Sequence, residues 1–256
     1  MTDSKHQLWS IVIPTLWRSD HTIRLLQELN QSPRVGEVIL IDNSPEDCPS
    51  ILKGISKKLV YLPQKENIYV NPAWNLGVRN AQYDLICICN DDIVFDTDVF
   101  HACGQELNRN EQATIVGAHK NSYPRADSKV LRPIHFTHGH WIGKGWGSLL
   151  FFSKSHWKNI PNELLIYSGD RYITTKFRNI KSILVEINGD SGVSSQSKEF
   201  SPILKRDQKN FDALTNHFER SKFRCTHATS FGRFNAFVYL AHCIKEVAAI
   251  ALGRNQ

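Results

Sequence analysis

Two adjacent carboxylates, Asp91 and Asp92, follow the apolar run Leu85 to Cys89, with only Asn90 between. Like charges repel each other, and the end of a buried strand offers this acidic pair little water. Oxygen ligands suit Mg²⁺ or Mn²⁺, which bind through one or two carboxylates and complete their shell with water and substrate phosphates. The acidic pair therefore indicates a divalent-cation site. The alternative is that both residues only begin a turn after the strand.

The elements that must hold these carboxylates alternate along the first half of the chain as short apolar runs and helical patterns. Continuous apolar strands separated by helices are typical of a parallel sheet that is covered on both faces. The predicted strands are Trp9 to Thr15, Val38 to Ile41, Leu59 to Leu62 and Leu85 to Cys89, and the predicted helices are one capped by Asp20, Asn71 to Ala81, and Asp96 to Asn108.

Polar clusters lie at the ends of three of the predicted strands. They are Pro14 with Thr15, Asp42 to Ser44, and Asn90 to Asp92. Ligands of open parallel sheets bind beyond the carboxyl ends of the strands. We therefore expect an α/β domain with a mainly parallel sheet and a site where these three clusters meet.

The second half of the chain is less regular. Strands are predicted at Ser148 to Phe152 and at Ile183 to Ile187, and residues 119–147 are rich in His, Gly and aromatic side chains. A loop is predicted at residues 188–198, followed by a basic, mainly helical tail. We therefore divide the chain into one half of a domain at 1–118, its other half at 119–199, and a helical C-terminal extension at 200–256.

Charge is distributed unevenly between the two halves. Residues 1–119 carry 10 Lys and Arg against 15 Asp and Glu, a net charge of −5, and residues 120–256 carry 21 against 10, a net charge of +11. This asymmetry predicts that one half holds a cation while the other meets an anion such as phosphate, nucleic acid or a lipid surface. Uneven solvation of the surface is the alternative.

Three absences in the sequence indicate a compartment. The six cysteines form no CxxC pair, the first residues carry no signal-peptide pattern, and no stretch is long and apolar enough to span a bilayer. The apolar late stretch, Phe237 to Leu252, suits an amphipathic helix that either packs on the domain or lies on an anionic membrane. A reduced, cytoplasmic protein is the simplest interpretation.

The order of the polar clusters resembles the nucleotide-sugar half of GT-A-type glycosyltransferases, particularly the inverting family 2. The matching positions are Pro14-Thr15, Asp42 to Ser44, Asn75 to Gly77, and Asn90 to Asp92. The resemblance implies a GT-A-like, Rossmann-like fold, with residues 1–118 as the nucleotide-sugar half and 119–199 as the acceptor half. It also implies transfer of a sugar from a nucleoside-diphosphate sugar, with a UDP-sugar favoured.

Residue roles in the donor site also follow from the resemblance. Asp42 would accept an N–H of the nucleobase, Asp91 would lie near the ribose and the metal, and Asp92 would be the principal protein ligand of Mg²⁺ or Mn²⁺. Asn90 stands where many relatives carry an acidic residue. Nucleotide-sugar contacts are expected from Pro14, Thr15, Arg18, Asp42, Asn75 and Asp91.

The downstream sequence is similar to the acceptor half of the same family. It carries Gly147 to Phe152, Trp157, Pro161 and Gly169-Asp170. The family places its catalytic base at the start of a helix, and the resemblance assigns that role to Asp170, so that transfer would invert the anomeric centre. Gly169 replaces the first acid of the family's usual pair. The alternative for Asp170 is a helix N-cap.

Four histidines are weaker candidates for ligand contacts. His227 is either a late metal ligand or a structural histidine. His135, His138 and His140 suit an acceptor-lining loop better than a zinc site, because no cluster of Cys or acidic residues stands near them in the sequence.

Basic and aromatic residues offer further contacts to the diphosphate or the acceptor. Lys205, Arg206 and Lys209 suit either a mobile loop over the diphosphate or a solvated helix face. Trp141 and Trp146 would stack on a sugar or a base, or else belong to the core.

The acceptor is less defined than the donor. The resemblance favours a cell-surface or lipid-linked glycan assembled at a cytoplasmic membrane face, and the basic half suits an anionic surface. A hydroxylated or hydroxymethylated DNA base, as in phage-type DNA glycosyltransferases, is the alternative acceptor. A sugar nucleotidyltransferase is the alternative from another class, although it should carry a glycine-rich loop where this chain has residues 15–18.

Overall fold

The computed structural model describes residues 7–50, 52–55, 58–109, 113–119, 122, 135–137, 145–189 and 197–215. The strands are β1 (Trp9–Thr15), β2 (Val35–Asp42), β3 (Leu59–Pro63), β4 (Leu85–Cys89), β5 (Ile93–Phe95), β6 (Thr114–Ala118), β7 (His135–Thr137), β8 (Leu149–Ser153), β9 (Asn179–Leu184) and β10 (Ile187–Gly189). The α-helices are α1 (His21–Gln31), α2 (Leu52–Ile55), α3 (Val70–Asn80), α4 (Val99–Arg109), α5 (Gly169–Lys176) and α6 (Ser201–Leu214).

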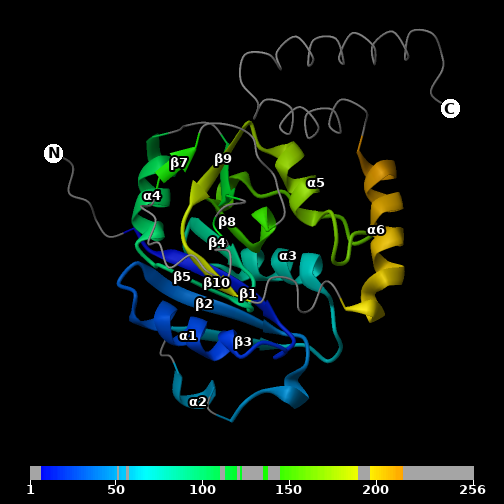
Figure 1. Cartoon of the computed structure of the whole chain (residues 1–256), viewed down its shortest axis with the longest axis horizontal. Helices are drawn as coiled ribbons and strands as arrows, with labels where there is room; N and C mark the ends of the chain where they lie inside the picture. Colours follow the sequence, from blue (N-terminus) through cyan, green and yellow to red (C-terminus); the bar gives the residue numbers. More distant parts are fainter. Residues whose placement is uncertain are drawn as a thin grey trace, which may run out of the picture.

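Eight of these strands form one sheet in the order β3-β2-β1-β4-β8-β6-β9-β7, with helices on both faces (Figure 1). β1 pairs in parallel with β2 and β4, and β2 with β3. β8 runs antiparallel between β4 and β6, whereas β6 and β9 are parallel. The register places Thr15 opposite Asp42 at the carboxyl ends of β1 and β2. The predicted α/β fold with a mainly parallel sheet and a C-terminal helical element is confirmed.

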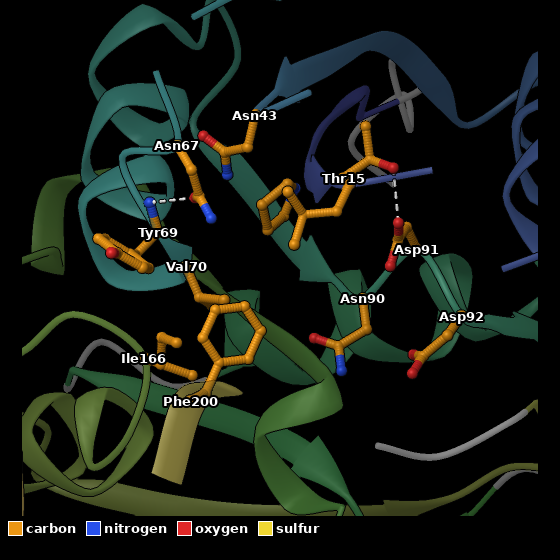
Figure 2. Close-up of a pocket in the computed structure, with 12 residues that line it drawn as sticks. Thr15, Asn43, Asn67, Tyr69, Val70, Asn90, Asp91, Asp92, Ile166 and Phe200 are labelled. Atoms are coloured by element: carbon orange, nitrogen blue, oxygen red, sulfur yellow. Dashed lines mark hydrogen bonds between the residues drawn. The ribbon is translucent and has the colours of Figure 1, made fainter. Parts of the chain in front are cut away.

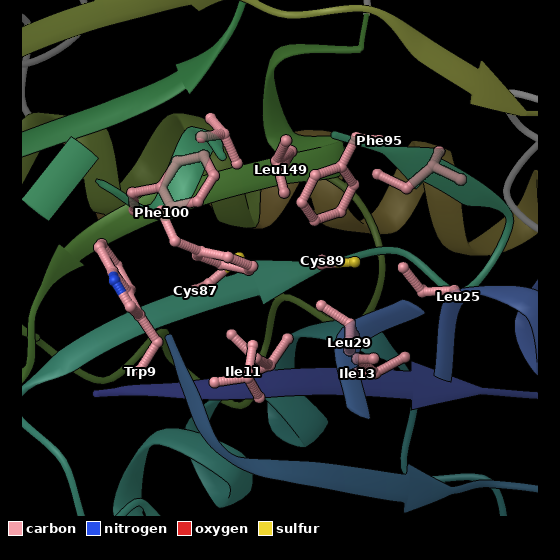
Figure 3. Packing of buried hydrophobic residues seen from close by; sticks show 14 of the residues in the cluster. Trp9, Ile11, Ile13, Leu25, Leu29, Cys87, Cys89, Phe95, Phe100 and Leu149 are labelled. Atoms are coloured by element: carbon pink, nitrogen blue, oxygen red, sulfur yellow. The ribbon is translucent and has the colours of Figure 1, made fainter. Parts of the chain in front are cut away.

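Side chains of the central strands alternate between two apolar layers. Ile11 and Ile13 of β1 pack in the layer with α1 and α4, whereas Val12 packs in the layer with α3. Figure 3 shows the first layer, in which the rings of Trp9 and Phe100 lie 5.5 Å apart between centroids. Strands buried on both faces must be apolar at successive positions, which explains the continuous apolar runs in the sequence.

Two helices begin differently from their predicted caps. Asp20 occupies the N-cap position of α1, but its side chain makes no capping hydrogen bond. The Ser19 hydroxyl accepts the backbone N–H of His21 instead, at 3.1 Å. α4 begins at Val99 rather than at Asp96, because the Asp96 carboxylate accepts a backbone N–H within the turn before the helix.

The predicted strand from Ile183 to Ile187 is in fact two strands. β9 ends at Leu184, and β10 begins at Ile187 and pairs antiparallel with β5 in a separate two-stranded sheet. A Cβ atom on Gly189 of β10 would collide with the carbonyl oxygen of Asp92. The second strand therefore lies directly against the segment that carries the acidic pair.

The described part of the predicted C-terminal extension contributes to the core. Phe211 of α6 is fully buried among the residues of the second apolar layer. Among the helices that the structure describes, none is long and apolar enough to cross a membrane. The late stretch from Phe237 to Leu252 lies outside the described residues.

Candidate active site

A pocket lies where the carboxyl ends of β1 and β4 meet the segment before α3 and the start of α6. Figure 2 shows Thr15 and the acidic pair on one side of it and Asn67 and Tyr69 on the other, with the Phe200 ring pointing between them. Of the residues predicted to bind the donor or the metal, four line this pocket together: Pro14, Thr15, Asp91 and Asp92.

Hydroxyl groups from two elements hold Asp91 in place. The Thr15 hydroxyl donates to Oδ2 of Asp91 at 2.6 Å (Figure 2). The Thr22 hydroxyl of α1 donates to the Asp91 carbonyl at 3.1 Å. Thr15 Oγ1 also accepts the backbone N–H of Trp17 at 2.9 Å, and Trp17 has a left-handed φ of 57°. A strained turn after β1 thus orients the threonine that orients the carboxylate.

The electrostatics of the acidic pair fit a cation. Both side chains are buried, with Asp91 9% and Asp92 5% exposed. Burial raises the pKa of Asp91 to about 6; the Thr15 hydrogen bond opposes this rise, and the Asp92 charge adds to it. Within the described residues no three His, Cys, Asp or Glu side chains cluster as a metal site. The two buried carboxylates are hard oxygen donors, which fit Mg²⁺ or Mn²⁺ with further ligands from water and phosphate.

Asp170 lies in the first turn of α5, connected to the acidic pair by a short chain of contacts. A Cβ on Gly147 would be 2.8 Å from both Cβ and Oδ2 of Asp170. The next residue, Ser148, accepts the backbone N–H of Asn90 through its carbonyl at 2.9 Å. Burial raises the pKa of Asp170, and the backbone N–H and charge of Arg171 oppose that rise. A carboxylate so placed suits a proton acceptor.

The turn before Asp170 explains the glycine that replaces an acid of the family pattern. Ser168 is the N-cap residue of α5 and has a left-handed φ of 61°. A Cβ on Gly169 would collide with Oδ1 of the fully buried Asn71. A second carboxylate therefore has no room at position 169 while Asn71 is in place. Because Ser168 occupies the N-cap position, the N-cap alternative for Asp170 does not apply.

Asp42 lies outside the lining of the pocket. It is fully buried; its Oδ1 accepts the backbone N–H of Ser44 at 2.9 Å, and its Oδ2 accepts the Tyr61 hydroxyl at 2.6 Å. Oδ2 thus joins β2 to β3, and Oδ1 holds the turn that follows β2. The neighbouring Asn43 lines the pocket instead, with its Oδ1 accepting the backbone N–H of Ile68 at 3.2 Å.

Asn75 also lies away from the pocket. Its Nδ2 donates to the carbonyl of Ile160 at 2.7 Å, and its Oδ1 accepts the Ile160 backbone N–H at 2.9 Å. It lines a separate cavity between α3 and residues 159–162. The amide therefore joins α3 to the second half of the domain, and the structure does not bring it together with the acidic pair.

Arg18 reaches the edge of the pocket through the residues before α6. Its guanidinium forms an ion pair with Glu199 at 2.5 Å and lies 5.6 Å from the centroid of the Phe200 ring. Phe200 also meets the Tyr69 ring edge to face, at 6.4 Å between centroids. One wall of the pocket thus comes from the predicted C-terminal extension.

The other predicted contacts in the described residues belong to the helix surface or to the core. Lys205, Arg206 and Lys209 are exposed on α6, and they form neither a loop nor part of the pocket lining. Trp146 is fully buried, and a Cβ on Gly117 would collide with its indole. Trp146 is therefore a core side chain and not a ligand contact.

The remaining predicted residues are not placed by the structure. His138, His140, Trp141 and His227 lie outside the described residues, and only the backbone of His135 is described, in β7.

Sequence reasoning missed the side of the pocket that faces the acidic pair. Tyr69 has a left-handed φ of 67°, and its backbone N–H donates to Oδ1 of Asn67 at 2.8 Å. Both residues lie several positions beyond β3, whereas the polar clusters that the sequence indicates lie at the strand ends. Ile166 and Phe200 enter the lining from distant segments, and no local pattern in the sequence indicates this.

Comparisons with known proteins identify the family and the fold. A family model described as glycosyl transferase family 2 matches residues 10–176. The crystal structure of S. aureus TarS 1–349 is similar with a TM-score of 0.55 at 12% identity, covering 90% of this chain and 74% of that chain. The crystal structure of the same protein in complex with UDP-GlcNAc is similar with a TM-score of 0.55 at 14% identity, covering 90% of this chain and 75% of that chain. No curated protein sequence matches the chain. The structural likeness confirms the GT-A-like fold.

Proposed function

The chain belongs to glycosyl transferase family 2 and is a glycosyltransferase, and we propose that it moves a sugar from a nucleoside-diphosphate sugar to an acceptor hydroxyl with metal dependence and inversion. The observation that carries this proposal is the buried acidic pair in the pocket at the end of β4. A short chain of contacts through Gly147, Ser148 and Asn90 connects this pair to Asp170. A cation site and a proton acceptor are the two groups that such a transfer needs.

The pocket suits a nucleoside diphosphate as the leaving group. Tyr69 and Phe200 offer apolar rings against which a base or ribose can pack, and Asn43 and Asn67 add amide groups to the same lining (Figure 2). Structures of the similar TarS contain UDP-GlcNAc and UDP. Together these observations support a UDP-sugar as the donor.

Asp92, with Asp91 beside it, would hold Mg²⁺ or Mn²⁺, and enzymes of this family generally use divalent metals. When bound, such an ion stabilises the negative charge that develops on the departing diphosphate. The protein's own part is to orient the two carboxylates. Thr15 does so through its hydrogen bond to Asp91, and Gly189 does so by allowing β10 to lie against the Asp92 backbone.

Asp170 would take the proton from the acceptor hydroxyl as that oxygen attacks the anomeric carbon. The new bond forms on the face opposite the leaving diphosphate, so the configuration at this carbon inverts. The Arg171 backbone N–H and the close contact with Gly147 fix the direction of the carboxylate. Its raised pKa makes it a stronger proton acceptor than an ordinary aspartate.

For the acceptor, we propose a cell-surface or lipid-linked glycan. The support is the net charge of +11 on residues 120–256, which exceeds what a single diphosphate requires and suits an anionic or membrane-borne substrate.

The experiment supplies UDP-GlcNAc and other nucleotide sugars with Mn²⁺ and measures release of nucleoside diphosphate. Lipid-linked glycan and hydroxymethylated DNA are offered in parallel. Transfer to DNA alone would contradict the glycan proposal. Pyrophosphate-dependent turnover would indicate a sugar nucleotidyltransferase and contradict the proposed sugar transfer.

Replacement of Gly147 by Ala is expected to lower kcat while the KM for the donor stays near its wild-type value. The new methyl group would press on Cβ and Oδ2 of Asp170 and displace the carboxylate. A misplacement of about 1 Å can cost about 10²-fold in rate. Steady-state kinetics check this result, with Gly54→Ala as the control, because a Cβ on Gly54 meets nothing within 4 Å. A normal kcat in Gly147→Ala would contradict the placement of the base.

The rate of transfer is expected to fall as the pH is lowered. Because the pKa of Asp170 is raised, this fall should begin at a higher pH than for an ordinary aspartate, whose pKa is about 3.9. Asp170 must be ionised to accept a proton, and burial raises its pKa, so protonation removes activity at a higher pH. Arg171→Gln removes a charge that opposes this rise and should move the acid limb further upward, whereas Arg171→Lys should move it less. Profiles of kcat against pH at saturating Mn²⁺ test this; an identical limb in all three proteins would contradict it.

A further inference from the structure

We propose that Asp207 of α6 is a positioning residue for the catalytic base, so that α6 is a working part of the active site. This inference rests on the proposed role of Asp170. Asp207 is fully buried, although most carboxylates on a surface helix face water. Its burial therefore calls for partners, and the structure supplies them from the segment that leads to Asp170.

A single oxygen of Asp207 binds three consecutive backbone groups. Oδ2 accepts the N–H of Leu165 at 3.1 Å, of Ile166 at 2.8 Å and of Tyr167 at 2.9 Å. Hydrogen bonds from backbone N–H groups satisfy a carboxylate oxygen that burial removes from water. Three such bonds fix the path of the chain immediately before the N-cap residue of α5.

The same turn is held from its other side by α3. The backbone N–H of Asn71 donates to the Leu165 carbonyl at 2.9 Å, and Asn71 Nδ2 donates to the Tyr167 carbonyl at 3.4 Å. Asp207 thus binds the N–H groups of residues 165–167, and Asn71 binds two of their carbonyls. Only Ser168 and Gly169 separate this clamped turn from Asp170. Asp207 and Asn71, which both lie outside α5, therefore hold the turn from which the helix of the base begins.

Further contacts join α6 to the residues around the base. The Arg171 guanidinium donates to Oε1 of Gln208 at 2.9 Å and lies 4.5 Å from the centroid of the Phe211 ring. Asn210 Nδ2 donates to the Glu163 carbonyl at 2.8 Å. These residues and Asp207 are spaced as one side of a helix. Figure 1 shows α6 along the edge of the molecule, beyond α3 and α5.

The clamped turn also reaches the donor pocket. Ile166, whose N–H binds Asp207, lines that pocket together with Phe200, the residue directly before α6. A helix that merely stabilised the fold would not need to bind the backbone between the donor pocket and the base. The geometry therefore points to a positioning role and not only to packing.

A double-mutant cycle separates positioning from general stability. We compare kcat of wild type, Asp207→Ala, Asp170→Asn and the double variant, and measure UDP binding with Mn²⁺ by calorimetry. If Asp207 acts through Asp170, Asp207→Ala lowers kcat by about 10-fold or more. The Kd for UDP stays within about twofold of the wild-type value. In the Asp170→Asn background, Asp207→Ala causes no further loss of kcat. Asp207→Asn, which keeps an acceptor oxygen, should lie between wild type and Ala.

Three results would overturn the inference. A wild-type kcat in Asp207→Ala would show that Asp207 does not position the base. If Asp207→Ala lowers kcat by the same factor in the wild type and in Asp170→Asn, Asp207 serves the general structure of the protein. Wild-type turnover in Asp170→Asn would overturn the base itself, and with it the proposed mechanism. Thermal unfolding shows whether each variant folds. If Asp207→Ala does not fold, the same double-mutant cycle is measured with Asp207→Asn. Asp98→Asn, the same kind of change at an exposed carboxylate outside the pocket lining, is the control.

Discussion

Asp170→Asn is expected to lower kcat for transfer by about 10²- to 10⁴-fold, which is the typical contribution of a general base. The amide keeps the shape of the side chain and can still accept the backbone N–H of Arg171, but it cannot take a proton from the acceptor hydroxyl. Binding of the donor should change little, because Asp170 is not part of the pocket lining. The measurement is steady-state kinetics with acceptor in excess, together with the Kd for UDP.

The control for this variant is Asp98→Asn, the same chemical change at an exposed carboxylate outside the pocket lining. It should retain the kcat of the wild type. Turnover within a few-fold of wild type in Asp170→Asn would show that another group accepts the proton.

Asp92→Asn is expected to lose metal-dependent donor binding and to reduce kcat/KM on the order of 10²- to 10³-fold. An amide is a much weaker ligand than a carboxylate for a divalent cation, so the charge on the departing diphosphate would lose its stabilisation. Part of the loss should be recovered as Mn²⁺ is raised. Activity titrated against Mn²⁺ in both proteins checks this expectation.

The same substitution should raise the thermal stability of the protein in the absence of metal. Asp91 and Asp92 are adjacent and both buried, so their negative charges repel each other, and this repulsion contributes to the raised pKa of Asp91. Removing one charge relieves that repulsion. A lower activity with a higher Tm would separate loss of function from loss of fold. An unchanged Mn²⁺ requirement in Asp92→Asn would instead exclude Asp92 as a metal ligand.

The strands and the acidic pair could be predicted from the sequence because their signals are local. A strand buried on both faces is a continuous apolar run, and β1 and β4 appear as such runs at their observed bounds. Asp91 and Asp92 follow the end of β4 with only Asn90 between, so the topology of the sheet brings them to the same edge as Thr15. The apolar runs and the polar residues that follow them are therefore sufficient to predict the fold and the centre of the site.

The rest of the site could not be predicted because it depends on contacts between distant residues. Asp42 and Asn43 are adjacent in sequence, and the Tyr61 hydroxyl of β3 is what holds the carboxylate away from the pocket lining. Phe200 lies far along the chain from Tyr69, yet their rings are in contact at the same pocket. The sequence predicts that a basic tail exists, but not that Asp207 within it binds the turn before Asp170.

The most direct test is a crystal structure of the protein soaked with UDP-GlcNAc and Mn²⁺, with the metal located by its anomalous scattering. We predict the Mn²⁺ peak within coordination distance of Asp92, the diphosphate on the far side of the metal, and the uridine between Asn43, Tyr69 and Phe200. We also expect the anomeric carbon to lie between the diphosphate and Asp170. Nucleotide bound outside this pocket, or Mn²⁺ bound away from the acidic pair, would contradict the proposed mechanism.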